Sequence, residues 1–189
     1  TFVWFNYRRC PAVALAHQLV AEGRLGDIHH VRATYLQEWG GPETPLLWRF
    51  QKKNAGSGAH GDLNAHIIDM ARFVLGDEVK EVNGAIARTF VKERKLLSGK
   101  GTGRSTVDDA VLFLATFKKG AVASFEASRV AHGHQNRNTL EVNGTLGSLR
   151  FDFEDMNLLW FLDANDDPRT RGWRRIMCTG GDVHPYAGN

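Results

Sequence analysis

What the sequence has little of excludes several classes of protein. Its two cysteines, Cys10 and Cys178, stand far apart and outside any C-x-x-C pair, which argues against a disulfide-rich secreted domain and predicts two buried thiols. No apolar run approaches the roughly 20 residues that span a bilayer, and the start lacks a basic-then-apolar leader. We therefore expect a cytoplasmic protein with no membrane contact.

Neither sign of charge dominates, because 24 Lys and Arg face 21 Asp and Glu, for a formal charge of +3. A nucleic-acid-binding domain usually carries a concentrated basic stripe, so no nucleic-acid partner is expected. The one basic segment, residues 90–107, is rich in glycine and is interpreted as a solvated loop, with phosphate or nucleic-acid contact as its alternative. The hydrophobic share, 42%, is that of an ordinary globular protein.

Both ends of the sequence suggest a piece of a longer protein. Residues 2–5 form an apolar run typical of a buried strand, and residues 180–189 finish in turn residues. We expect residues 1–10 to leave a preceding domain, and residues 11–189 to form a second domain that is truncated at its C-terminus.

The hydrophobic spacing predicts two helices followed by strands. Residues 11–23 and 60–76 show helical spacing, the first beginning with Pro11 and the second ending at Gly76. Residues 27–39 alternate as a strand, with Tyr35 and Gln37 pointing to the same side. Between this strand and the second helix, residues 40–58 are predicted to be a long loop, which is often functional. Val- and Phe-rich segments between residues 79 and 152 predict more strands, with turns at Lys119-Gly120 and Asn143-Gly144 and with Asp108 and Asp109 opening one strand. The fold class is therefore α+β, with a mostly antiparallel sheet.

The chemistry-bearing residues gather in GSGAHGDLNAH, residues 56–66. On a helix, Asp62 and His66 are four apart and lie side by side, where the carboxylate can orient the imidazole and favour its protonated form. From these residues alone three interpretations stay open: a helix cap beside a partly buried histidine, a metal site that adds His60, or an acid–base pair. The metal interpretation lacks a fourth ligand, so no metal is expected.

Five segments, in the same order, resemble the second domain of the Gfo/Idh/MocA family of glucose–fructose oxidoreductase, inositol dehydrogenase and rhizopine-catabolism proteins. They are FNYRRCPA (5–12), LVAEGRLGDIHHVRATY (19–35), WRFQKKNAGSGAHGDLNAHIIDMARFVLG (48–76), VDDAVLFLATFKKGAVASFEASRV (107–130) and LEVNGTLGSLRFD (140–152). The resemblance implies a large, mostly antiparallel open sheet with helices on one face, whose open face packs against another subunit of a homo-oligomer. It also implies a sugar, inositol or related polyol as substrate, with NAD or NADP as cofactor.

The resemblance implies two catalytic residues. His66 would accept the proton of the substrate hydroxyl, while Asp62 would orient it and the substrate, with the loop glycines letting the chain pass close to cofactor and substrate. The sequence lacks the family's Glu-Lys-Pro lysine and any G-x-G-x-x-G that follows a strand. We expect no cofactor-binding residues in this chain, the cofactor to be held mainly by a domain outside it, and the fragment alone to be inactive.

Weaker candidates for substrate contact mostly have a structural alternative. The alternatives are a core position for the tryptophans, a loop anchor for Arg49, solvated turn positions for Arg129 and His132, and simple exposure for His60. His184 is a candidate because its segment resembles a family loop that approaches the pocket. These candidates are Trp39, Trp48, Arg49, His60, Arg129, His132 and His184. Three rival functions also remain: an NAD-dependent glycosidase or other enzyme on the same scaffold, a non-catalytic scaffold or regulatory relative, and a metal hydrolase.

Overall fold

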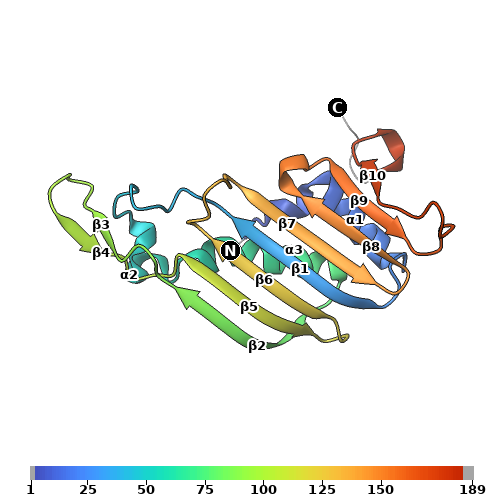
Figure 1. The fold of residues 1–189 in the computed structure, drawn as a ribbon, viewed down its shortest axis with the longest axis horizontal. Coiled ribbons are helices and arrows are strands. Elements are labelled where there is room, and N and C mark those ends of the chain that lie inside the picture. The colour runs from blue at the N-terminus through green and yellow to red at the C-terminus, as the bar shows by residue number, and fades with distance from the viewer. Residues whose placement is uncertain (1–2, 185–189) are drawn as a thin grey trace.

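The computed structural model describes residues 3–184, which form one large sheet and two main helices (Figure 1). In this described part the sheet has eight strands in the order β10-β9-β8-β7-β1-β6-β5-β2, and only the β1–β6 pair is parallel. The α+β prediction, with a mostly antiparallel sheet, is confirmed. The strands are β1 (Ile28–Leu36), β2 (Val79–Arg88), β5 (Ala110–Phe117), β6 (Val122–Ser128), β7 (Arg137–Gly144), β8 (Gly147–Asp152), β9 (Leu158–Asp163) and β10 (Arg174–Met177).

Both main helices cover the same face of the sheet and lie behind it in Figure 1. Helix α1 (Pro11–Ala21) begins with Pro11, whose missing N–H costs nothing in a first turn, and α3 (Ala65–Leu75) ends at Gly76 in the left-handed conformation. The side chains of Ile67, Met70 and Val74 on α3 are fully buried against the sheet. Burial of each such side chain stabilises the fold by about 1.5–3 kcal/mol.

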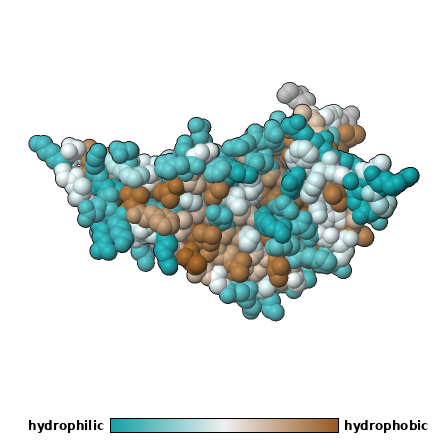
Figure 2. Space-filling model, in the orientation of Figure 1, coloured by the Kyte–Doolittle hydropathy of each residue, from teal (hydrophilic) through white to brown (hydrophobic). Residues whose placement is uncertain are grey.

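The other face of the sheet is open and partly apolar. Figure 2 shows hydrophobic side chains over β2, β5 and β6, without a covering layer. The large apolar side chains there are between 44% and 58% exposed, namely Val82, Ile86, Leu112, Leu114 and Val122. The helices-on-one-face architecture is therefore confirmed, and this open face consists of residues that a globular protein normally buries.

The basic segment 90–107 differs from its prediction as a solvated loop. It forms a hairpin of β3 (Glu93–Lys95) and β4 (Thr102–Arg104), and its Arg94 side chain is fully buried. The guanidinium donates to the carbonyls of Gly40 and Thr44 and to Asp109. Composition could not reveal this, because a buried arginine depends on acceptors that only the fold brings together.

Three smaller predictions also need correction. Residues 3–5 are not a buried strand, since Val3 and Trp4 are 65% and 64% exposed. The predicted Asn143-Gly144 turn falls instead on the next two residues, since Gly144 is the last residue of β7. A Cβ at Gly144 would lie 2.2 Å from the Leu25 carbonyl oxygen. The loop 40–58 contains short helical turns, η2 (Trp48–Phe50) and α2 (Lys52–Ala55).

Further short turns complete the described chain. They are η1 (Asn6–Arg9), the π-helical turn η3 (His60–Asn64), η4 (Phe153–Asp155) and η5 (Gly181–Val183). Cys10 and Cys178 are both free and buried, which confirms the prediction of two buried thiols.

Candidate functional site

The site begins with a π-helical turn, η3, that runs directly into α3. The Ala65 N–H bonds to the His60 carbonyl five residues back, instead of four as in an α-helix. The sequence predicted one continuous α-helix in which Asp62 and His66 lie in the i, i+4 relation. The wider turn changes how these two side chains are presented, and such turns are frequent at functional sites.

Asp108 holds the start of this turn in place. Its carboxylate accepts hydrogen bonds from the backbone N–H groups of Gly58 (2.9 Å) and His60 (2.8 Å), and its carbonyl accepts one from Ala59 (3.0 Å). A Cβ on Gly58 would lie 1.8 Å from the Asp108 carbonyl oxygen. The close approach that this glycine permits is therefore to the backbone before β5.

Beside this turn lies a cleft of about 390 Å³. Its lining residues come from β1, the loop that follows it, η2, and the junction of η3 with α3. They are Tyr35, Gln37, Trp39, Leu47, Arg49, Asp62, Leu63 and His66. The fold thus brings together four of the predicted site residues: Asp62, His66, Trp39 and Arg49.

Asp62 is paired with two arginines. Its Oδ2 accepts a hydrogen bond from Arg129 Nη2 at 2.9 Å, and its Oδ1 lies 3.3 Å from Arg49 Nη1. The expected contact in which Asp62 orients the His66 ring is not among the hydrogen bonds of the described residues. Asp62 acts on His66 through its charge, at longer range.

His66 lies among aromatic rings at the inner end of the cleft. Its ring meets those of Tyr7 and Phe5 edge-on, at 5.1 and 5.8 Å between centroids. Burial lowers the pKa of His66 below its ordinary value of 6.5, and it outweighs the charges of Asp62 and Asp69, which raise that pKa. Asp62 does favour the protonated form, as predicted, but desolvation has the larger effect and the net pKa is lowered. The Nδ1 atom is buried without a hydrogen-bond partner among the described residues.

One wall of the cleft is a chain of hydrogen bonds that the sequence did not reveal. Tyr35 Oη and Gln37 Nε2 each donate to Asn136 Oδ1 at 2.7 Å, and Trp39 Nε1 donates to Gln37 Oε1 at 2.6 Å. The alternation in β1 did predict that Tyr35 and Gln37 point to the same side. It carried no signal for Asn136, which enters from the segment before β7.

The remaining predicted residues lie outside the cleft lining. The Trp48 side chain is 56% exposed and lies beside Arg49, and His60 is also exposed. His132 is 81% exposed at its side chain, and His184 Nδ1 contacts the backbone of Gly180. Trp39 lines the cleft and also packs on the core residue Phe50.

Arg129 departs from both interpretations, the solvated turn and the substrate contact. Its side chain is 2% exposed and is not among the residues that line the cleft. It reaches the site from behind, through Asp62.

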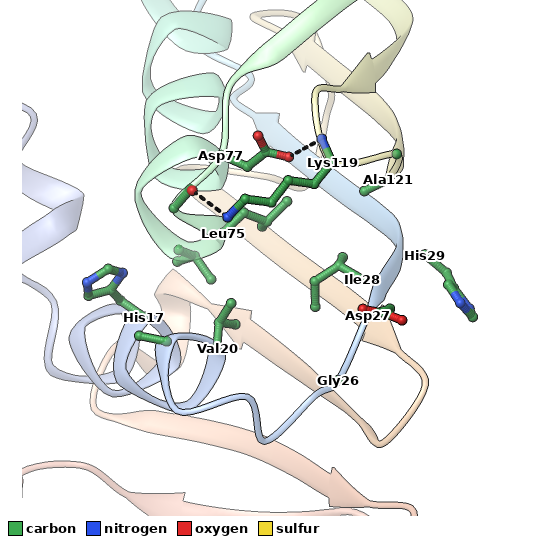
Figure 3. Close-up of a pocket in the computed structure, with 14 residues that line it drawn as sticks. His17, Val20, Gly26, Asp27, Ile28, His29, Leu75, Asp77, Lys119 and Ala121 are labelled. Atoms are coloured by element: carbon green, nitrogen blue, oxygen red, sulfur yellow. Dashed lines mark hydrogen bonds between the residues drawn. The ribbon is translucent and has the colours of Figure 1, made fainter.

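A larger cavity, about 820 Å³, lies at the opposite end of α3 (Figure 3). Its polar groups mostly serve the end of that helix. His17 Nδ1 lies 2.8 Å from the Phe73 carbonyl oxygen, and Lys119 Nζ donates to the Gly76 carbonyl oxygen at 3.1 Å. Cationic and imidazole groups at a helix C-terminus satisfy its free carbonyls, so these contacts have a structural role. The smaller cleft, with Asp62 and His66, is the candidate active site.

Within residues 3–184, no three His, Cys, Asp or Glu side chains are grouped so that they could hold a metal ion. Among the same residues, no helix is both long and apolar enough to cross a membrane.

The fold and the cleft together define an α+β domain with a carboxylate and an imidazole beside a cleft at the start of a helix. A family model described as the GFO/IDH/MocA C-terminal domain matches residues 13–150. The chain belongs to this family.

Named relatives agree with this assignment. The levoglucosan dehydrogenase of Pseudarthrobacter phenanthrenivorans is 45% identical over 97% of this chain and 50% of its own length. A levoglucosan dehydrogenase solved in complex with NADH and levoglucosan is 48% identical, with a TM-score of 0.89 over 96% of this chain and 47% of that one. An oxidoreductase domain protein from Kribbella flavida is 55% identical, with a TM-score of 0.91 over 96% of this chain and 48% of that one. The chain therefore spans about half the length of these relatives.

Proposed function

We propose that this chain is the substrate-binding part of an NAD-dependent oxidoreductase that acts on a sugar, inositol or related polyol. The observation that carries the proposal is a cleft in which a half-buried imidazole with a lowered pKa, His66, lies near the charge of Asp62. A group that is neutral at physiological pH can accept a proton, which the oxidation of an alcohol requires. The levoglucosan dehydrogenase relative, solved with NADH and levoglucosan, supports the substrate class and the cofactor.

In the proposed reaction His66 accepts the proton of the substrate hydroxyl. The proton would go to Nε2, because Nδ1 is buried. Bound NAD would supply the hydride acceptor for the carbon that bears this hydroxyl, so that the alcohol would become a carbonyl. Asp62 would accept a hydrogen bond from the substrate and stabilise the imidazolium as it forms, while Arg49 and Trp39 would contact the sugar at the cleft mouth.

We extend the proposal to the domain organisation. Residues 1–10 would leave a dinucleotide-binding domain, and residues 11–189 would belong to the substrate-binding and oligomerisation domain. The half-length match to the relatives supports this division. The cofactor would be held mainly by that other domain, so the 189 residues alone would be inactive. We place the enzyme in the cytoplasm, in keeping with its proposed use of a dinucleotide cofactor.

The open face of the sheet would be the subunit interface. Its partly exposed side chains on β2, β5 and β6 are apolar, and pairing two copies would remove them from water. Leu114→Lys in the full-length protein is therefore expected to weaken the oligomer in sedimentation analysis. Unchanged sedimentation would argue against this interface.

The central test measures dinucleotide reduction by the full-length gene product with a panel of polyols and anhydrosugars that includes levoglucosan. His66→Ala is expected to lower kcat by about 10²–10⁴-fold, as is typical when a general base is removed. His29→Ala, an exposed histidine at the far end of β1, serves as the control. Full turnover in the His66 variant would remove that residue from the mechanism. Cleavage of a glycoside without net NADH would favour the glycosidase alternative, and absence of dinucleotide binding would favour a non-catalytic relative.

A further inference from the structure

We propose that Arg129 is a positioning residue that holds Asp62 in its working orientation, and that it does not contact the substrate. This inference rests on the proposed function, because it assigns Asp62 a part in the reaction. Arg129 donates to Asp62 Oδ2 at 2.9 Å and to the Arg49 carbonyl oxygen at 3.3 Å. Its side chain is 2% exposed and lies behind the cleft.

A buried guanidinium needs an anion nearby, and the anion available to Arg129 is Asp62. Among the described residues its one ion pair is with that carboxylate. The neighbouring buried arginine, Arg94, has its own carboxylate in Asp109, at 3.3 Å. Moving Asp62 away from Arg129 would leave a buried charge unpaired, which is strongly unfavourable. The position of Oδ2 is therefore fixed by the interior of the protein.

The guanidinium has little freedom to move. It lies over the Trp39 ring, 5.2 Å from its centroid, and near the Phe50 ring at 6.0 Å. The backbone of Arg129 is bonded on both sides, since its N–H donates to the Asp109 carbonyl and its own carbonyl accepts from Gly40 N–H. Gly40 packs so closely that a Cβ there would lie 2.8 Å from the Cβ of Arg129.

The second arginine at Asp62 differs in each of these respects. Arg49 is 43% exposed, and its Nη1 is 3.3 Å from Oδ1, a longer contact than that of Arg129. A solvated arginine at this distance can exchange its partner for a substrate hydroxyl at small cost. One oxygen of Asp62 is thus committed to the interior, and the other is available to the cleft.

A double-mutant cycle in the full-length enzyme tests the proposal. The variants are Arg129→Met, Asp62→Asn and the combination, each measured for kcat/KM with the polyol substrate, for KM with NAD and for thermal unfolding. We expect Arg129→Met to lower kcat/KM for the polyol by about 100-fold through misplacement of Asp62, with little change in KM for NAD. In the Asp62→Asn background the same change should cost less than about 3-fold, since Arg129 acts through Asp62.

Two further variants separate positioning from a loss of fold. Arg129→Lys keeps the charge but not the two-pronged donor, so a partial recovery of kcat/KM is expected. Arg94→Met removes an equally buried arginine that does not touch Asp62, and its effect on kcat/KM should be the same with or without Asp62→Asn. It is also expected to lower the unfolding temperature.

Each outcome bears on the proposal. If the loss of kcat/KM in the double variant equals the product of the losses in Arg129→Met and Asp62→Asn, the proposal is overturned. Wild-type kinetics in the Arg129→Met variant would also overturn it. Full activity in both Asp62→Asn and His66→Ala would overturn the proposed function and the positioning role together. An impaired Asp62→Asn variant with an additive cycle would overturn the positioning role alone. We also expect the effects of the two substitutions on thermal unfolding to be non-additive, whatever their effects on activity. Additive losses of stability would count against the pairing of Arg129 with Asp62.

Discussion

Replacing Gly58 by alanine should destabilise the protein far more than an exposed glycine-to-alanine change. The added Cβ would lie 1.8 Å from the Asp108 carbonyl oxygen and 2.8 Å from its carbonyl carbon. Both atoms belong to the backbone, so no flexible side chain can move aside. Relief requires the loop and the segment before β5 to separate by roughly 1.5 Å or more, the distance to a normal van der Waals contact.

This separation determines the size of the expected effect. Overpacking of this kind costs about 1–3 kcal/mol, and it would also weaken the two hydrogen bonds from Gly58 and His60 to the Asp108 carboxylate, each worth about 1.5–3 kcal/mol. Since these bonds would be strained without being wholly lost, we expect a decrease of about 3–5 kcal/mol in the free energy of unfolding. For a chain of this size that lowers Tm by roughly 6–20 °C.

Thermal unfolding followed by circular dichroism, with denaturant titration for the free energy, is the appropriate assay. Gly84→Ala in β2 is the matched control, because no atom lies within 4 Å of a Cβ built there and its φ is not positive. The control should stay within about 0.5 kcal/mol of the parent protein. A Gly58→Ala variant that is equally close to the parent would refute the account of how η3 is held.

Three other predictions follow from the described contacts. Burial lowers the pKa of His66 below its ordinary value of 6.5. Because a proton acceptor must be neutral, kcat/KM for oxidation should fall only below pH 6.5. A pH–rate profile with its acidic limb at or above 6.5 would contradict this. The same shift favours the folded state above pH 6.5, and that contribution to stability is lost as the pH falls through the folded pKa. Burial raises the pKa of both Cys10 and Cys178 to about 11. A thiol reagent at about pH 8 should therefore label neither cysteine until the protein unfolds. Rapid labelling of the native protein would show that the two thiols are not buried. Asp109→Ala leaves the buried Arg94 guanidinium without its carboxylate and should cost about 3–5 kcal/mol in denaturant titration; a loss below about 1 kcal/mol would mean that the pair is solvated.

The elements that the sequence predicted well are those in which local periodicity and burial agree. The helix that begins with Pro11 appears as predicted, and the strand predicted over residues 27–39 forms over Ile28–Leu36. Helix α3 ends at Gly76 with its apolar stripe buried. One-sided burial leaves a period of 3.6 or 2 in the chain itself, so one sequence suffices to read it. The adjacency of Asp62 and His66 in sequence was equally visible.

The sequence by itself therefore determined the α+β class and the helix that carries the candidate site, and it singled out Asp62 and His66 as candidates at the start of that helix. Only the tertiary structure decided what those residues touch. Asp62 bonds to Arg49 and Arg129 instead of the His66 ring, and the hairpin that holds Arg94 was predicted to be a loop. The physical reason is that a buried arginine is stable only beside acceptors from segments distant in sequence, and that desolvation of an imidazole depends on the rings packed around it. Neither of these leaves a periodic signal in the chain.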